Sequence, residues 1–92
     1  MKNFFSEIDD ITLTFSDIQT NSDGMENIRI YFERPSTKGF DFLETVLPSL
    51  IVKKAVGFNS GETEKLLEYA RTNAFLIWEI AREGADVIAS SR

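Results

Sequence analysis

The chain has 92 residues, of which 42% are hydrophobic and 27% charged, and it carries a formal net charge of −5 without any histidine or cysteine. A chain of this length forms one small domain, and its composition is that of an ordinary globular protein. No apolar run reaches the roughly 20 residues of a membrane-spanning helix. The absence of cysteine and of a leader-like apolar stretch predicts a cytoplasmic location and no membrane partner.

The charge is distributed unevenly. Residues 1–45 contain nine acidic and four basic side chains, whereas residues 46–92 contain six of each. An acidic surface repels phosphate backbones and attracts basic proteins, although net charge also helps to keep a small protein in solution. We therefore expect no nucleic acid partner, and a basic protein partner is one interpretation.

Two segments with alternating polarity predict an antiparallel pair of strands. Residues 10–16 read DITLTFS and residues 28–33 read IRIYFE, so that every second side chain is apolar. In the second segment Arg29, Tyr31 and Glu33 share the polar face. This alternation is typical of a strand with one buried face.

The segment between them, TNSDGME at residues 20–26, has the spacing of part of a calcium-binding loop. Aligned in that way, the loop would begin at Gln19 and end at Ile30, where an EF-hand carries an acid and a bidentate glutamate. Asp-Gly between alternating segments is instead a strong hairpin signal, because glycine tolerates positive φ. We interpret the segment as a turn without metal.

Residues 40–56 are compatible with two strands or with a short helix followed by a strand. Phe42 and Val46 share one parity, and Pro48 restricts the residue before it to extended conformations. An aliphatic run with β-branched side chains follows. We predict two strands with a corner at Pro48-Ser49.

A long amphipathic helix of about 22 residues is predicted between an N-cap at Asn59 or Ser60 and Gly84. Asn59 and Glu62 have the spacing of a capping box at its start. Gly84 is a natural residue to follow its end. We expect residues 85–92 to form a frayed tail.

The apolar side chains of this helix cover an arc of roughly 200°, wider than the ~100° that packing on one sheet requires. Self-association through a flank would cover the excess, as would a curled sheet together with an N-terminal arm. Phe75 lies in the middle of the polar face, and aromatic and arginine side chains are enriched at binding hot spots. Asn73 lies in the apolar arc, where we expect a structural amide bonded to sheet backbone or to a hydroxyl.

The groups that catalysis commonly uses are scarce. Without histidine or cysteine, carboxylate chemistry remains, with Asp9, Asp10, Glu33 or Glu44 as candidates to hold Mg²⁺ or act as acid and base. Adjacent aspartates before a strand point to opposite faces. We therefore predict no enzyme, no cofactor and no metal site, and a small Mg²⁺-assisted enzyme is one alternative.

The leading interpretation is a non-catalytic protein-interaction or regulatory module that binds a protein, with a homodimer formed through the helix as one form. A second alternative is an acidic, antitoxin-like inhibitor of a basic partner. Tyr31 beside an arginine could stack a base, but it stands alone on its face of the sheet. The candidate interaction residues are Arg71, Phe75, Trp78, Arg82, Arg29 and Tyr31.

The predicted fold class is α+β: an antiparallel β-meander of three to four strands with one long C-terminal α-helix packed on one face. Residues 1–92 form a single domain, with residues 1–8 as an N-terminal arm. The predicted core consists of Ile11, Leu13, Phe15, Ile28, Ile30, Phe32, Val46, Leu50, Val52, Leu66, Ala70, Ala74, Ile77 and Ala81.

Overall fold

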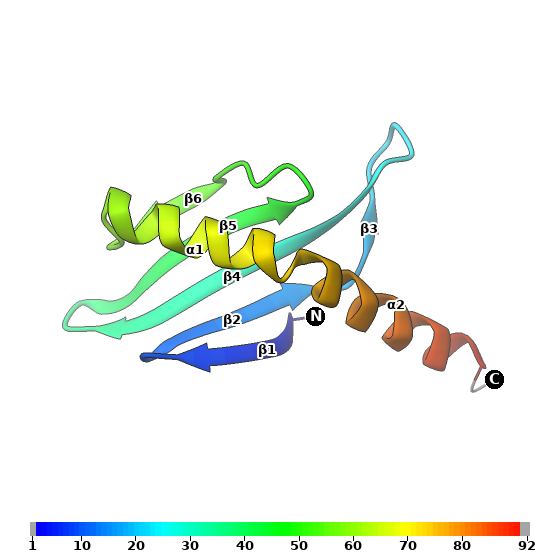
Figure 1. The fold of residues 1–92 in the computed structure, drawn as a ribbon, viewed down its shortest axis with the longest axis horizontal. Coiled ribbons are helices and arrows are strands. Elements are labelled where there is room, and N and C mark those ends of the chain that lie inside the picture. Colours follow the sequence, from blue (N-terminus) through cyan, green and yellow to red (C-terminus); the bar gives the residue numbers. More distant parts are fainter. Residues whose placement is uncertain (1, 91–92) are drawn as a thin grey trace.

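The structure, a computed structural model, describes residues 2–90, with the side chains of residues 2–84. An antiparallel sheet is covered on one face by two consecutive helices (Figure 1). The chain follows the order β1 (Lys2–Ile8), β2 (Ile11–Ser16), β3 (Gln19–Thr20), β4 (Glu26–Ser36), β5 (Gly39–Leu47), β6 (Lys54–Val56), α1 (Ser60–Thr72) and α2 (Ala74–Ser90). The predicted α+β class is thus confirmed, with more strands than expected and a divided helix.

The spatial order of the strands is β1-β2-β4-β5-β6, and β3 pairs with the start of β4. Cross-strand pairing brings Leu13 opposite Phe32 and Phe15 opposite Ile30, so the apolar residues of β2 and β4 are neighbours on one face. Burial of such neighbours is the main favourable contribution to a small sheet. The buried core consists of Leu13, Phe15, Ile28, Ile30, Phe32, Leu43, Leu47, Phe58, Ala70 and Ile77.

The segment expected as an N-terminal arm, residues 1–8, forms the edge strand β1 from Lys2 onward. The sequence of β1 does not alternate regularly between polar and apolar residues, because its register with β2 shifts between Phe4 and Ser6. The shift turns Phe5 toward the core, where its ring packs edge-to-face against Phe15 at 6.4 Å between centroids. Phe4 remains exposed on the opposite face of the sheet.

Residues 40–56 form two strands with a turn at Pro48-Ser49, as predicted, but the second strand is Lys54–Val56 and the aliphatic run at residues 50–52 is a loop. Two expected core residues also lie outside the core. Pairing with β4 directs Leu43, Thr45 and Leu47 to the helix-covered face, so Val46 points to the other face. The buried hydroxyl of Thr45 donates to the carbonyl oxygen of Ile51 at 2.9 Å, so its burial leaves no unsatisfied hydrogen-bond donor. Val52 lies in the loop before β6 and is exposed.

The single long helix that we predicted is divided at Asn73 and ends later than expected. The capping box at its start is present: Asn59 Oδ1 accepts from the Glu62 amide, and the Glu62 carboxylate accepts from the Asn59 amide. Hydrogen bonds from Asn73 N to Tyr69 O and from Ile77 N to Asn73 O connect α1 to α2, which run end to end (Figure 1). Gly84 does not adopt a left-handed conformation, so it does not end the helix, and α2 continues to Ser90.

The segment at residues 20–26 is a turn, as predicted. The Asn21 amide donates to Met25 O at 2.8 Å, and the Gly24 amide donates to Asn21 O at 3.0 Å. Gly24 has φ +87°, the left-handed conformation that this turn requires. The Asp23 carboxylate accepts from the Met25 amide rather than facing a ligand site.

Candidate interaction surfaces

The outer face of the helices, opposite the sheet, carries the most exposed large apolar side chain of the described residues. Phe75 exposes 76% of its surface, the next residue Leu76 exposes 50%, and Ile80 exposes 39%. Isolated exposed apolar residues are common. At about 100° per residue, Leu76 and Ile80 lie about 100° and 140° around the helix from Phe75, so Phe75 is the candidate contact residue of the outer face and Leu76 lies on its flank. The last turns of α2 also extend beyond the end of the sheet (Figure 1).

Charged side chains surround Phe75. Glu68 and Arg71 form an ion pair one turn apart in α1, with side chains exposed by 57% and 66%. Glu79 and Arg82 lie on the following turns of α2 and are exposed. We call Glu68, Arg71, Phe75, Glu79 and Arg82 the outer seam.

Trp78, which we had grouped with Phe75 as an interaction residue, lies on a flank and is half-buried against the core. The Arg82 guanidinium lies 5.4 Å from the centre of its indole ring. The same arginine donates to Glu26 Oε1 at 2.8 Å, a contact that ties α2 to the start of β4. Trp78 therefore contributes mainly to packing, and the face of its ring contacts Arg82 of the outer seam.

Asn73 has the structural role that we predicted, with a different partner. Its side-chain amide donates to Tyr69 O at 2.9 Å, within its own helix. Its backbone, at φ −99° and ψ 5°, departs from helical geometry and interrupts the helix for one residue. The interruption lies two residues before Phe75.

The uncovered face of the sheet carries the other two candidate residues, Arg29 and Tyr31. The expectation that Tyr31 stands alone there is wrong, because Phe42 of β5 lies on the same face, with 6.2 Å between the ring centroids. The Lys2 ammonium lies 4.3 Å from the centre of the Tyr31 ring. Phe42 was missed on this face because it shares its parity with Val46, which we predicted to point into the core.

Charges on this face largely neutralise one another. Arg29 pairs with Glu44 at 3.2 Å, and Lys2 pairs with Glu33 at 3.6 Å. A stacking platform for nucleic acid combines aromatic rings with an excess of positive charge. The aromatic pair is present here, and carboxylates engage two of the neighbouring cations, Arg29 and Lys2, while the Lys54 ammonium lies 5.8 Å from the centre of the Phe42 ring.

The described helices and sheet meet in one strong polar cluster. Arg34 on β4 donates to Asp41 Oδ2 through two nitrogens at 2.8 and 2.6 Å, and to Glu62 Oε2 at 2.7 Å. The Arg34 guanidinium also lies 4.5 Å from the centre of the Phe58 ring. Its contacts with Glu62 and Asp41 raise the pKa of Arg34, and the hydrogen bond from Arg34 lowers the pKa of Glu62. This cluster fixes the start of α1 to the sheet.

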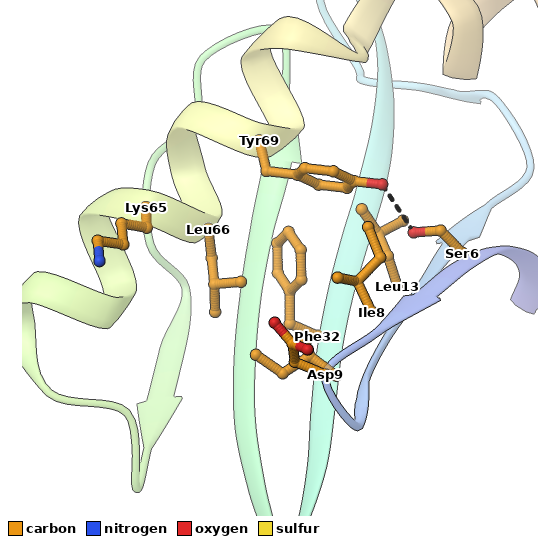
Figure 2. Close-up of a pocket in the computed structure, with 9 residues that line it drawn as sticks. Ser6, Ile8, Asp9, Leu13, Phe32, Lys65, Leu66 and Tyr69 are labelled. Carbon is orange, nitrogen blue, oxygen red and sulfur yellow. Dashed lines mark hydrogen bonds between the residues drawn. The ribbon is translucent and has the colours of Figure 1, made fainter.

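A cavity of about 210 Å³ lies between α1 and the β1–β2 turn (Figure 2). Leu13, Phe32 and Leu66 form apolar walls, and the Tyr69 hydroxyl donates to Ser6 Oγ at 3.0 Å at one side. Asp9 lies at the rim beside these walls (Figure 2). Lys65 also lines the cavity, but its ammonium is directed away from Asp9 (Figure 2), so these two groups do not converge as an acid and a base would.

The candidate catalytic carboxylates do not converge. Asp9 and Asp10 form the two-residue β1–β2 turn, with φ of 52° and 65°. Glu33 and Glu44 lie on the uncovered face, each paired with a cation. Among the residues described, no three acidic side chains are grouped so that they could hold a metal ion.

The candidate residues thus belong to two separate surfaces. Arg71, Phe75 and Arg82 lie on the helices, and Arg29 and Tyr31 lie on the opposite side of the sheet. The chain matches no protein-family model, no curated protein and no solved structure. No helix in the described part of the chain is long and apolar enough to cross a membrane.

Proposed function

We propose that the chain is a non-catalytic protein-interaction module that binds a polypeptide through the outer face of α1 and α2. The observation that carries the proposal is the exposure of Phe75, 76% of its surface, on a helix whose opposite side is already packed against the sheet. An aromatic ring flanked by arginines, Arg71 and Arg82, is the composition typical of an interface centre. The separated carboxylates support no comparable argument for an enzyme.

A photo-reactive side chain provides the test. Benzoylphenylalanine in place of Phe75 should form a discrete covalent adduct with a protein when the chain is expressed in its native host and irradiated. Phe40 offers a matched control, because it is an aromatic residue with 63% exposure at the β4–β5 turn, away from the helices. Adducts from position 75 and none from position 40 would support the proposal.

Two results would contradict it. One is an unmodified monomer after irradiation at position 75, and the other is the same pattern of adducts from both positions. In either case Phe75 would be an isolated exposed aromatic residue without a dedicated partner.

A further inference from the structure

The outer seam has a symmetry in its charges. Counting from Phe75, Glu68 and Arg71 lie seven and four residues before it, while Glu79 and Arg82 lie four and seven residues after it. On the N-terminal side of Phe75, the nearer residue, Arg71, is positive and the farther one, Glu68, is negative. On the C-terminal side, the nearer residue, Glu79, is negative and the farther one, Arg82, is positive. A second copy that runs in the opposite direction thus places each arginine at the level of a glutamate.

The structure presents these five side chains on one side of the helices. At about 100° per residue these five positions fall within an arc of about 80°, and all five residues are exposed. The arc is centred on Phe75, and the Arg82 guanidinium reaches from it to Glu26 at the start of β4. The hydrogen bonds from Asn73 N to Tyr69 O and from Ile77 N to Asn73 O keep the four-residue spacing of an α-helix across the interruption, so the arc continues from α1 into α2. The sheet covers the opposite side, which leaves room for another helix pair to approach.

We propose that the partner of this surface is a second copy of the chain, bound with its helices antiparallel and the two Phe75 rings in contact at the centre. This inference rests on the proposed function and specifies its partner. Arg71 of each copy lies opposite Glu79 of the other, and Glu68 lies opposite Arg82. The arrangement is isologous, as a two-fold symmetric dimer requires.

The charges select this orientation over the alternatives. A parallel pair in register would bring Glu68 against Glu68 and Arg71 against Arg71, and like charges at such positions repel. The seam contains two arginines and two glutamates, so it has no net charge with which to select a basic partner. Antiparallel helices also bring opposite ends of their dipoles together.

The existing contacts of these residues leave them free to pair. The ion pair between Arg71 and Glu68 is exposed, and so is the pair between Arg82 and Glu26, in which the side chains are exposed by 55% and 44%. A guanidinium carries five N–H donors, so each arginine can keep its present contact while binding a second carboxylate. Exposed ion pairs are individually weak, so here they set the orientation while Phe75 and the adjacent Leu76 supply apolar contact area.

Charge reversal tests the pairing. In a dimer of the Arg71→Glu variant, a glutamate at position 71 of each copy faces Glu79 of the other copy. In a dimer of the Glu79→Arg variant, an arginine at position 79 of each copy faces Arg71 of the other copy. Each variant alone should dissociate at least about ten-fold more readily than the wild type in sedimentation equilibrium. An equimolar mixture of the two should recover association, because in the mixed dimer both pairs again have opposite signs.

The chain offers matched controls. Lys65→Glu and Glu83→Arg make the same changes of charge at exposed helical positions that lie to one side of the seam. Both should associate like the wild type. Circular dichroism melting curves of all variants show whether any loss of association reflects unfolding, and recovery in the mixture would exclude that cause.

A second measurement needs no charge change. Because the chain has no cysteine, Leu76→Cys introduces one thiol near the proposed two-fold axis. A short bismaleimide should join two copies at this position, while Lys38→Cys in the β4–β5 turn should not react in this way.

The outcomes separate this inference from the proposed function. A wild-type chain that stays monomeric at high concentration, or a dimer indifferent to Arg71→Glu and Glu79→Arg, overturns the antiparallel pair. Adducts with a different protein at position 75 would still support the interaction module in that case. If no adduct forms at position 75, both the antiparallel dimer and the interaction module are contradicted.

Discussion

At the scale of single residues, Gly57 shows how closely the sheet and the loop before α1 approach. It has φ +87°, and a Cβ added there would lie 2.0 Å from Asp41 Oδ1. Asp41 would have to move, and with it the two hydrogen bonds from Arg34. Glycine at this position thus permits both the positive φ and the close approach of Asp41, which belongs to the polar cluster with Arg34 and Glu62.

Gly57→Ala should therefore lower the free energy of unfolding by roughly 2–3 kcal/mol, the sum of left-handed strain and a disturbed hydrogen-bonded pair. Gly24→Ala is the matched control, because Gly24 has the same φ and no atom within 4 Å of the added Cβ. It should lose only about 1 kcal/mol. Urea denaturation measures both, and equal losses would show that the contact with Asp41 is unimportant.

Glu62 couples stability to pH. Its pKa is lowered from 4.5, first by the hydrogen bond from Arg34 and then by the Asn59 amide. A carboxyl group with a lower pKa in the folded state stabilises the protein above its unfolded pKa, and this contribution is lost as pH falls through the folded pKa. Acidification below about 4.5 should therefore weaken the fold at this site.

Glu62→Gln should accordingly show a shallower decrease of melting temperature than the wild type as pH falls from about 5 to 3. Glu64→Gln, an exposed position on the same helical turn, should follow the wild-type profile. Parallel curves for Glu62→Gln and the wild type would contradict the assignment. Thermal melts in matched buffers provide the measurement.

At the scale of elements, the β1–β2 turn explains the adjacent aspartates without metal or catalysis. Both Asp9 and Asp10 have positive φ, the combination that defines a two-residue type I′ turn, and Ile8 pairs directly with Ile11 across it. Aspartate tolerates this conformation better than most residues, and glycine tolerates it best.

Asp10→Gly should therefore raise the free energy of unfolding by roughly 0.5–1 kcal/mol, whereas Asp10→Ala should lower it. Guanidinium denaturation measures the two variants against the wild type. A loss of stability in Asp10→Gly would indicate that the carboxylate, and not the backbone, accounts for aspartate here.

The elements also show what the sequence could predict. Strands β2 and β4, the turn at residues 20–26 and the capping box at Asn59 all follow local rules, and the structure confirms them. Strand β1 was missed because its bulge breaks the alternation at Phe4-Phe5. Such register shifts depend on the neighbouring strand, which the local sequence does not contain.

The prediction that Val46 of β5 points into the core was wrong for a similar reason. Val46 is the more apolar residue, yet Thr45 is buried, because pairing with β4 sets the register and the carbonyl of Ile51 accepts the threonine hydroxyl. The same register places Phe42 beside Tyr31. Of the candidate site, the exposure of Phe75 in the polar arc followed from helical periodicity, whereas the packing of Trp78 needed the tertiary structure.

At the scale of the whole molecule, the layers are stacked along the shortest axis, since α1 lies over the sheet in the view down that axis (Figure 1). The molecule measures 45 × 27 × 22 Å. A dimer joined through the outer helix faces grows along the 22 Å direction, whereas a dimer joined end to end grows along the 45 Å direction.

Small-angle X-ray scattering on the associated protein should therefore show a doubled mass with only a modest increase in maximum dimension. An end-to-end dimer would instead approach roughly twice the 45 Å length. A long, thin particle would contradict a dimer built through the outer seam, and the Arg71→Glu variant should return the scattering profile to that of one copy.

The bulge in β1 has a consequence for solubility under stress. An edge strand offers unpaired amide and carbonyl groups that template fibril growth when another chain aligns along them. The shift between Phe4 and Ser6 interrupts that template in the middle of β1, and the opposite edge, β6, spans only Lys54–Val56. Both margins of the sheet therefore offer a second chain only short stretches of regular edge on which to align.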